Sequence, residues 1–462
     1  MQRLLAIAWL TWKAALRFRL FLVIAVLLIA SVVGLPILIK DDGTARGFTQ
    51  ILLTYTLSTI TALLGLSTLW LSCGTLARDI EECQMQMLVV KPIARWQIWL
   101  GKWLGILSLN AALLALTGAC VYGLLLWRAA KLPAAEQAIL NNEILVARGS
   151  LKEKSPDDVI KTEAEQVLQD RLKQNPVTTV DLPEVRKQIL EQVKAAYQIV
   201  PPGYERQWKI DLGWRAKLLR DQPLQLRVKF NSAAKSPSGT FDVLWQVGVP
   251  QKTKLWRTEE PMSLAPDTFH EFTITPDLFD EKGVLTITMV NPNNTALLFP
   301  LNEGMEVLYH EGGFGLNFAR GLGIILCWMA LLSAIGLASA CFLSFPVAAF
   351  FSLGILAMAF STGTLASVVS EGTIMSRSSE TGKLSSSVVD VVVVPFFRAA
   401  LGLINLAKGF SPIDSLSSGR SISWAELSLA FGQIVLLLGG IFAVFGIFIF
   451  NRRELAAGQA TQ

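Results

Sequence analysis

Residues 321–370 read GLGIILCWMALLSAIGLASACFLSFPVAAFFSLGILAMAFSTGTLASVVS, without a single charged side chain. The hydrocarbon core of a bilayer is about 30 Å thick, and a helix of about 20 apolar residues crosses it, so this run is long enough for two crossings. Pro346 lies near the middle, where a chain that emerges briefly at the membrane surface would reverse. Gly336 and Ala340 lie one helical turn apart and suit close contact between helices.

Four further stretches without charged residues are each long enough for one crossing: 20–39, 47–77, 103–127 and 427–451. Together with the double run they predict six transmembrane helices. The composition agrees, because hydrophobic residues make up 52% of the 462 residues and charged residues only 17%, whereas about a quarter is usual in soluble proteins. No small-residue cleavage site follows the first stretch, so we expect it to remain as an anchor.

Lysine and arginine gather next to three of the connections. They lie before the first stretch, between the second and the third, and after the last: Arg3, Lys13, Arg17, Arg19, Arg78, Lys91, Arg95, Lys102, Arg452 and Arg453. Basic residues are enriched in cytoplasmic loops. With six spans, both termini are therefore predicted to be cytoplasmic. A polar block from Arg128 to about Glu311 is predicted to be extracytoplasmic.

This block is expected to fold as an α+β insert in two parts. Residues 128–207 are helical in pattern, because apolar side chains recur with a spacing of four: Val185, Ile189, Val193 and Tyr197. Residues 208–312 alternate apolar and polar side chains, most clearly over 224–230 and 241–247. Short alternating strands at this spacing predict a β-sandwich of the jelly-roll kind. None of the five cysteines lies in the block, so we expect it to fold without disulfides.

The predicted fold is thus a polytopic α-helical membrane protein with an extracytoplasmic α+β insert. Residues 1–127 would hold a basic helix lying in the membrane interface and the first three spans, although a simple extension of the first span fits its beginning nearly as well. Residues 313–462 would hold the other three. Within them, 371–426 is expected to form a re-entrant or interfacial segment on the outer side, because Asp390 and Arg398 would be costly in a lipid-facing helix.

The sequence shows no energy source of its own. It lacks the G-x-x-x-x-G-K-[ST] loop of nucleotide-hydrolysing proteins, and the six predicted spans contain no carboxylate of the kind that couples transport to ions. His270 and His310 are interpreted as ordinary sandwich residues rather than metal ligands. We therefore expect no enzyme activity, metal or cofactor in this chain, and we expect its energy to come from a partner.

A charged loop, residues 78–102, joins the second and third stretches. Its acidic beginning, RDIEE at 78–82, predicts a short helix that Pro92 ends near Lys91. A second helix would then run into the third span. An acidic cluster usually does no more than solvate a loop, and that interpretation is kept as the alternative to any binding role.

The whole loop carries a more specific pattern. Residues 78–105 read RDIEECQMQMLVVKPIARWQIWLGKWLG, and 448–455 read FIFNRREL. Both resemble type-2 ABC-transporter permeases, the first their cytoplasmic loop and the second their usual end. In the branch associated with multicopper-enzyme maturation a Gly-Thr pair follows the acidic residue, and here Cys83-Gln84 replaces it. The resemblance extends over the spans and these segments, and it does not cover the insert.

The resemblance implies the transmembrane subunit of an exporter in the cytoplasmic membrane of a bacterium. It implies a homodimer or a pair of permeases, surrounded by membrane lipid, with ATP and Mg²⁺ bound only by a separate cytoplasmic ATPase and with no nucleic-acid partner. The loop would couple to that ATPase through a set of charged and apolar residues: Arg78, Asp79, Glu81, Glu82, Met87, Lys91 and Arg95. The cargo does not follow from the resemblance.

A different class of function is the alternative, namely a membrane-anchored extracytoplasmic binding or scaffold protein without transport. Tryptophans of the insert bear on it, because aromatic faces grip sugars or lipid tails, although such residues more often fill a core. Trp245 alternates with the apolar face of its strand and is expected to be buried. Trp256 is the preferred candidate for an outer ligand contact, and Trp214 is the second.

Overall fold

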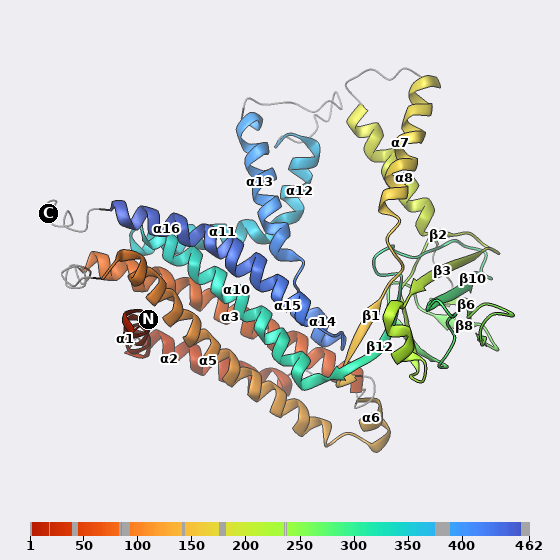
Figure 1. Cartoon of the computed structure of the whole chain (residues 1–462), viewed down its shortest axis with the longest axis horizontal. Coiled ribbons are helices and arrows are strands. Elements are labelled where there is room, and N and C mark those ends of the chain that lie inside the picture. Colours follow the sequence, from red (N-terminus) through yellow and green to blue (C-terminus); the bar gives the residue numbers. More distant parts are fainter. Residues whose placement is uncertain are drawn as a thin grey trace. The chain divides into compact units, whose positions relative to one another are not determined.

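The computed structural model describes residues 2–17, 19–38, 45–82, 85, 93–140, 144–174, 182–234, 236, 238–374 and 389–453. The chain divides into two compact units (Figure 1). The helical bundle comprises Met1–Ala147 and Gly312–Gln462, and the insert comprises Arg148–Glu311. The compact unit within the insert expected at 128–312 begins at Arg148, because the residues that follow the helix of the third span, up to Ala147, belong to the helical bundle.

The helical bundle contains the following helices: α1 (Gln2–Arg17), α2 (Arg19–Leu38), α3 (Ala45–Glu81), α5 (Arg95–Ala129), α6 (Ala134–Ile139), α10 (Phe314–Ala340), α11 (Phe345–Phe360), α12 (Thr362–Glu371), α13 (Asp390–Lys408), α14 (Pro412–Ser417), α15 (Trp424–Ala430), the π-helical η3 (Phe431–Gly439) and α16 (Gly440–Arg452). Figure 1 shows α3, α5, α10 and α16 running side by side. Their buried apolar side chains form two clusters, a larger and a smaller one.

Among the described residues, five helical segments are long and apolar enough to cross a membrane: Thr49–Glu81, Arg95–Ala129, Phe314–Ala340, Asp390–Ser417 and Trp424–Arg452. A sixth follows if α11 and the helix after it count as one span. The prediction of a membrane-embedded helical protein is confirmed at this level. The expected first span forms the 20-residue helix α2, of which Val23–Leu35 is described as a shorter apolar helix.

The expected fifth span consists of two helices, α11 and α12. The chain does reverse near Pro346, which lies in the first turn of α11 as expected. However, α11 and α12 meet at an angle of 66°. At the break, the Ser361 hydroxyl donates a hydrogen bond to the carbonyl of Ala357 (3.0 Å), and such bonding to the preceding turn bends helices. Hydropathy alone does not register this bend.

The segment after the bend was expected to re-enter or to lie at the interface. Its described part forms α13, which lies beside α12 (Figure 1) and also contacts η3. Asp390, which is costly in lipid, is buried and accepts a hydrogen bond from the backbone N–H of Ile374 (3.1 Å). By length and composition Asp390–Ser417 could also span, so the re-entrant placement stays a prediction.

Residues 83, 84 and 86–92, over which the short helix was predicted to continue, lie outside the described residues. The acidic beginning of the charged loop is described. It forms the last turn of α3, which continues to Glu81 because no glycine or proline interrupts it after Gly74. The expected second helix is confirmed, since α5 begins at Arg95 and runs into the third span. Small residues let the helices approach closely, as predicted for Gly336. A Cβ at that position would overlap the Ser72 hydroxyl of α3.

Helix α1 packs on α5 through a buried stripe of Ile7, Thr11 and Ala15. A Cβ on Gly101 would lie 2.7 Å from the Ile7 Cβ, and one on Gly105 would lie 2.9 Å from the carbonyl oxygen of Ala8. The opposite side of α1 exposes its large apolar residues beside its lysine and arginines: Leu5, Trp9, Leu10 and Leu16. This division is what a helix lying in the membrane interface requires.

Replacing Gly105 with leucine is expected to displace α1, because the new side chain would occupy the space of Thr11 and of the α1 backbone. Cysteines at Trp12 and Ser108, whose side chains hydrogen-bond at 2.8 Å, report the contact through oxidative cross-linking. We expect the yield of the cross-link between positions 12 and 108 to fall at least fivefold in Gly105→Leu. Gly123→Leu is the matched control, since nothing lies within 4 Å of a Cβ there. An unchanged cross-link in Gly105→Leu would contradict this packing.

The insert begins with a strand, where the sequence pattern indicated only helix, and then forms a helical hairpin and the remaining strands. Its elements are β1 (Val146–Leu151), α7 (Asp157–Gln174), α8 (Leu182–Gln198), β2 (Ile199–Val200), β3 (Glu205–Asp211), η2 (Gly213–Arg215), α9 (Ala216–Leu219), β4 (Leu224–Val228), β5 (Asn231–Ser232), β6 (Phe241–Val247), β7 (Trp256–Arg257), β8 (Met262–Leu264), β9 (His270–Ile274), β10 (Val284–Val290), β11 (Leu297–Leu298) and β12 (Met305–Gly313). The predicted stripe of α8 is confirmed, since Ile189 and Val193 are buried against α7.

Three sheets follow from the pairing of these strands. Their orders are β1-β12-β4-β9, then β3-β10-β6-β7 with β8 beside β6, and β2-β11-β5. The two larger sheets contribute side chains to one apolar core, in which Trp208 and Trp245 lie 6.2 Å apart between ring centroids. The alternation read from the sequence at 224–228 and 241–247 therefore identified the core face correctly.

Candidate functional site

Five helix ends meet at one end of the bundle: the ends of α3, α10 and α16 and the beginnings of α5 and α11 (Figure 1). Each helix terminus leaves backbone N–H or C=O groups without a partner in the helix. Charged side chains bind several of these groups here. We call the residues concerned the helix-end cluster: Arg78, Asp79, Glu81, Arg95, Lys102, Phe345, Phe450 and Arg453.

Arg95 joins the beginning of α5 to the end of α16. Its Nη1 donates to three carbonyl oxygens, those of Phe450 (2.6 Å), Asn451 (3.0 Å) and Arg453 (2.9 Å). Its guanidinium also lies 5.8 Å from the centroid of the Phe450 ring. A cation at a helix C-terminus is stabilised by the free carbonyls and by the helix dipole. Arg95 therefore holds the last turn of α16 against α5.

Arg453 continues the connection to α10. Its Nη1 donates to the carbonyl oxygen of Cys341 (2.9 Å), the residue directly after the last turn of that helix. Because Arg95 binds the carbonyl of Arg453 while the Arg453 side chain binds α10, the two arginines act in series. The beginning of α5 is thereby connected to the ends of both α16 and α10.

Lys102 joins α5 to α3. Its Nζ donates to the carbonyl oxygen of Thr75 (2.9 Å) and to Oδ2 of Asp79 (2.5 Å). The Lys102 side chain is only 8% exposed, and that of Asp79 is 26% exposed. A charge removed from water to this extent is tolerated because it is paired and hydrogen-bonded. Asp79 thus points into the bundle.

Glu81 joins α3 to α11. One carboxylate oxygen accepts a hydrogen bond from the backbone N–H of Phe345 (2.8 Å), at the first residue of α11. Carboxylates are favoured at that end of a helix. The Arg78 guanidinium lies 4.4 Å from the Phe345 ring centroid, and that ring meets Trp70 edge-on at 5.2 Å. Two charged residues of α3 therefore hold the start of α11.

The residues predicted to couple to an ATPase are thus found in two situations. Arg78, Asp79, Glu81 and Arg95 each contact another helix of the same chain. Glu82 is exposed and lies one residue beyond α3. Met87 and Lys91 lie outside the described residues.

From the sequence, Lys102 and Arg453 served only to predict which ends and loops are cytoplasmic. Phe345 was given no role. Their partners are distant in sequence, 112 residues from Arg453 to Cys341 and 264 from Glu81 to Phe345. The signal that could have identified Lys102 and Arg453 is position alone, since each lies beside the beginning or end of an uncharged run. Phe345 lies next to Pro346, where the chain was expected to reverse.

The three tryptophans considered in the insert differ in how far they are exposed. Trp245 is 1% exposed, as predicted. Trp256, the preferred ligand contact, is half-buried and stacks on Phe272 (5.8 Å between centroids), where it packs against the core. Trp214 is 72% exposed, and the Arg215 guanidinium lies 4.9 Å from its ring centroid. Of the two candidates, Trp214 is the more accessible one.

No group of three or more His, Cys, Asp and Glu side chains is arranged to hold a metal ion in the part of the chain that the structure describes. Comparison with protein-family models, with curated protein sequences and with solved structures finds no match to this chain. The class of protein is therefore defined by the fold itself. It is a helical membrane protein with an inserted unit of antiparallel β-sheets and a helical hairpin.

Proposed function

We propose that this chain is the transmembrane permease subunit of an ATP-driven exporter of the type-2 ABC class, working as a pair and powered by a separate cytoplasmic ATPase. The observation that supports this proposal is the helix-end cluster. A loop that receives force is useful only if the helices around it move with it. In this chain, side chains on both flanks of residues 83–92 bind other helices: Glu81 binds the beginning of α11, and Arg95 binds the end of α16. Arg453, beside the end of α16, in turn binds the end of α10.

The cluster gives each charged residue a role in transmission. When the ATPase displaces the loop, α3 and α5 would move together because Lys102 binds Asp79. Glu81 would carry the motion to α11, and Arg95 would carry it to α16. Coupling of this kind runs through rigid elements with two packed arrangements and needs no chemistry in the moving chain. The ATPase contact itself is assigned to Glu82 and to the residues after it, including Met87 and Lys91.

The insert would lie on the opposite side of the membrane and would receive or release cargo. A jelly-roll-like binding domain is the finer form of this proposal, with Trp214 as its exposed aromatic contact. The same proposal includes three further points. The insert lies outside the cytoplasm, the membrane is the cytoplasmic membrane of a bacterium, and two permease subunits work as a pair.

Site-specific photo-cross-linking in native membranes tests the proposed ATPase contact. A photoreactive residue at Glu82 is expected to give an adduct with a protein that carries a nucleotide-binding P-loop. Leu66 is the matched control, because it lies on the same helix, is 50% exposed and is four turns from the loop. An absent adduct at position 82, or an equal one at position 66, would count against the exporter. A membrane-anchored binding protein, which the separately folded insert would suit, would then take its place.

A further inference from the structure

A short helical segment of the insert exposes large apolar side chains. It consists of η2 and α9, residues 213–219, and we call it the η2–α9 segment. Trp214 is 72% exposed and Leu218 is 65% exposed. The two lie about one helical turn apart and therefore share one face. An aromatic and an aliphatic side chain side by side, each mostly in contact with solvent, are typical of a surface that binds a partner.

The opposite face holds the η2–α9 segment on the insert. Leu212 and Leu219 are buried, and they belong to the apolar core that the two larger sheets share. The backbone N–H of Leu212 donates to the carbonyl oxygen of Gly283 (2.8 Å), in the turn before β10. The segment is thus packed on one side along its length. Its two exposed side chains are held where they are by this packing.

The η2–α9 segment is also basic. Residues 212–220 read LGWRAKLLR, with three basic residues and no acidic one. The Arg215 guanidinium lies 4.9 Å from the centroid of the Trp214 ring, and Lys217 is exposed. Arg220 is paired with Asp277 at 3.2 Å, whereas Arg215 and Lys217 form no salt bridge with a described residue. The apolar side chains are therefore accompanied by two positive charges that can bind an anionic partner.

The chain keeps the η2–α9 segment within reach of a membrane-spanning helix. The Arg215 guanidinium lies 6.0 Å from the centroid of the Tyr309 ring. Tyr309 belongs to β12, which ends at Gly313, and the candidate span α10 begins at the next residue, Phe314. The steps of chain from Tyr309 to Phe314 cover at most about 18 Å when fully extended. The segment therefore cannot be far from the end of a span.

Exposed tryptophans with a cation beside the ring also occur in the helical bundle. Trp127, near the end of α5, is 56% exposed, and the Lys131 ammonium lies 3.5 Å from its ring centroid. Trp9 of α1 is 59% exposed, and the Lys13 ammonium lies 5.7 Å from its ring centroid. Tryptophan is enriched where membrane and water meet, and basic side chains there are attracted to anionic lipids. The η2–α9 segment repeats this combination on the insert.

We propose that the η2–α9 segment docks the insert on a lipid surface with anionic headgroups. Trp214 and Leu218 enter the membrane interface, and Arg215 and Lys217 bind phosphate oxygens of the lipids. These side chains lie at the depth of the headgroups, which water also reaches. The proposal gives the exposed aromatic contact of the insert a partner. It requires neither an ATPase nor a cargo, so it stands or falls separately from the exporter.

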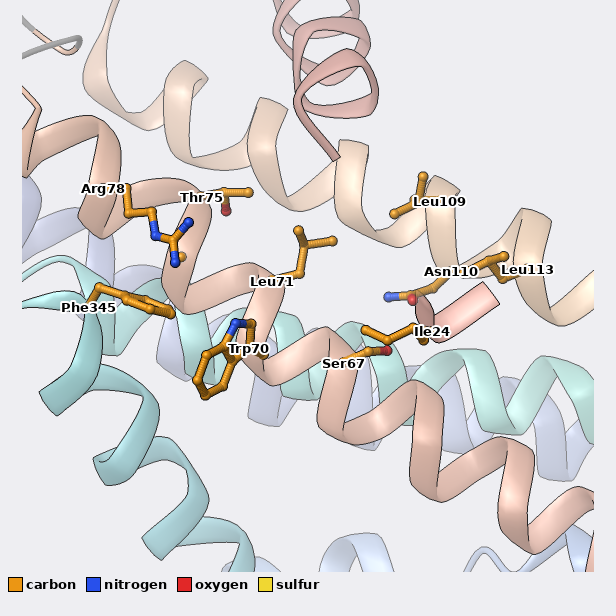
Figure 2. Close-up of a pocket in the computed structure, with 11 residues that line it drawn as sticks. Ile24, Ser67, Trp70, Leu71, Thr75, Arg78, Leu109, Asn110, Leu113 and Phe345 are labelled. Carbon is orange, nitrogen blue, oxygen red and sulfur yellow. The ribbon is translucent and has the colours of Figure 1, made fainter. Parts of the chain in front are cut away.

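The helical bundle also contains a cavity, between α2, α3 and α5 (Figure 2). Its volume of about 100 Å³ has room for a few water molecules but not for a lipid. Asn110 lines it, and the Nδ2 of Asn110 has no hydrogen-bond partner among the described residues. A water that accepts from this nitrogen and donates to the Ser67 hydroxyl satisfies it. The lipid contact is therefore assigned to the surface of the insert and not to this cavity.

Quenching of a fluorophore by lipids tests the docking. In a variant without native cysteines, a single cysteine replaces Leu218 and carries nitrobenzoxadiazole. The full chain is placed in nanodiscs of dioleoyl phosphatidylglycerol and dioleoyl phosphatidylcholine, with headgroup-nitroxide phosphatidylcholine as the quencher. Quenching at position 218 is expected to be at least threefold stronger than at position 159. Val159 is the matched control, because it is 56% exposed on α7 and follows an acid, Asp158. Equal quenching at both positions would overturn the proposal.

Two variants test the roles of the aromatic ring and of the cations. Trp214→Ala should reduce the quenching at position 218 at least twofold. Arg215→Gln with Lys217→Gln should do the same in nanodiscs with phosphatidylglycerol and have little effect in phosphatidylcholine alone, because the attraction to anionic lipids is lost. Lys252→Gln, which removes an exposed cation elsewhere in the insert, is the matched control.

The unfolding temperature of these variants should equal that of the wild type, because the replaced side chains lie outside the core of the insert. Quenching as strong in both variants as in the wild type would overturn the proposal. So would a fluorophore at position 218 that is shielded from iodide in water but is not quenched by the nitroxide lipid. That result would show that protein, such as a second copy of this chain, covers the segment.

Discussion

Lys102→Met is expected to destabilise the helical bundle by about 2–4 kcal/mol. Breaking a buried ion pair by removing one partner typically costs about 3–5 kcal/mol, and the estimate here is lower because Asp79 keeps some contact with water. The carboxylate of Asp79 and the carbonyl oxygen of Thr75 both lose their donor. Thermal unfolding of the purified chain in detergent measures the loss as a lower midpoint temperature.

A second substitution separates the lost pair from general damage to the packing. In the double variant Lys102→Met with Asp79→Asn, no unpaired charge remains, so more than half of the lost stability should return. Lys13→Met is the matched control, because that lysine lies on α1 with its ammonium 5.7 Å from the Trp9 ring. Equal instability of the single and double variants would show that the ion pair is not the cause.

Arg95→Ala is expected to release the end of α16 from α5. Hydrogen bonds to a charged group each contribute about 1.5–3 kcal/mol, and the three bonds of Arg95 share one nitrogen, so we expect a total loss of about 2–3 kcal/mol. The last turn of α16 should fray. Limited proteolysis after Arg452 and Arg453 should then proceed at least tenfold faster, while cleavage within the insert stays unchanged.

Arg452→Ala provides the matched comparison for that prediction. Arg452 lies at the same helix end, with its guanidinium 4.3 Å from the Phe448 ring, but it does not connect two helices through the contacts seen for Arg95. Replacing Arg452 should lower the midpoint temperature of unfolding by less than a third of the change that Arg95→Ala causes. Arg95→Lys should also fail to restore the wild type, because one ammonium cannot reproduce the guanidinium geometry. If Arg95→Ala were as stable as the wild type, Arg95 would not hold α16 against α5, and the prediction would be contradicted.

The sequence was sufficient for the parts of the fold that follow local patterns. Uncharged runs located α3, α5, α10 and α16, because crossing a bilayer requires only length and low polarity. Alternation located β4 and β6, because a strand with one buried face must alternate. The bend at Ser361 was missed, because a hydroxyl that bonds to the preceding turn leaves the mean hydropathy almost unchanged.

Polar residues in strands show where the same reasoning fails. The alternation over 224–230 marks Arg227 as solvent-facing, yet its side chain is only 8% exposed. It forms a salt bridge at 3.1 Å with Glu306, whose side chain is 1% exposed. Arg148 of β1 binds Glu271 of β9 at 2.9 Å in the same group. These charges meet because of the way the strands pair in the sheet. The sequence of one strand alone does not reveal that pairing.

For the candidate site, the sequence singled out the charged segment but did not predict the contacts that its residues make within the chain. Its charges identified the segment, since they stand out between two apolar runs. Their partners are mostly backbone carbonyls and N–H groups of distant helix ends, which every residue of a sequence possesses. A sequence therefore cannot distinguish an arginine that binds another protein from one that binds the end of a neighbouring helix.

Sidedness tests the central claim most directly, because an ATPase can bind the loop only if the loop is cytoplasmic. In a variant without native cysteines, single cysteines replace Glu82 beside the loop and the exposed Trp214 of the insert, and intact cells are treated with a membrane-impermeant maleimide. The account predicts that position 214 reacts in intact cells and that position 82 reacts only after the membrane is permeabilised. Labelling of position 82 in intact cells would contradict it.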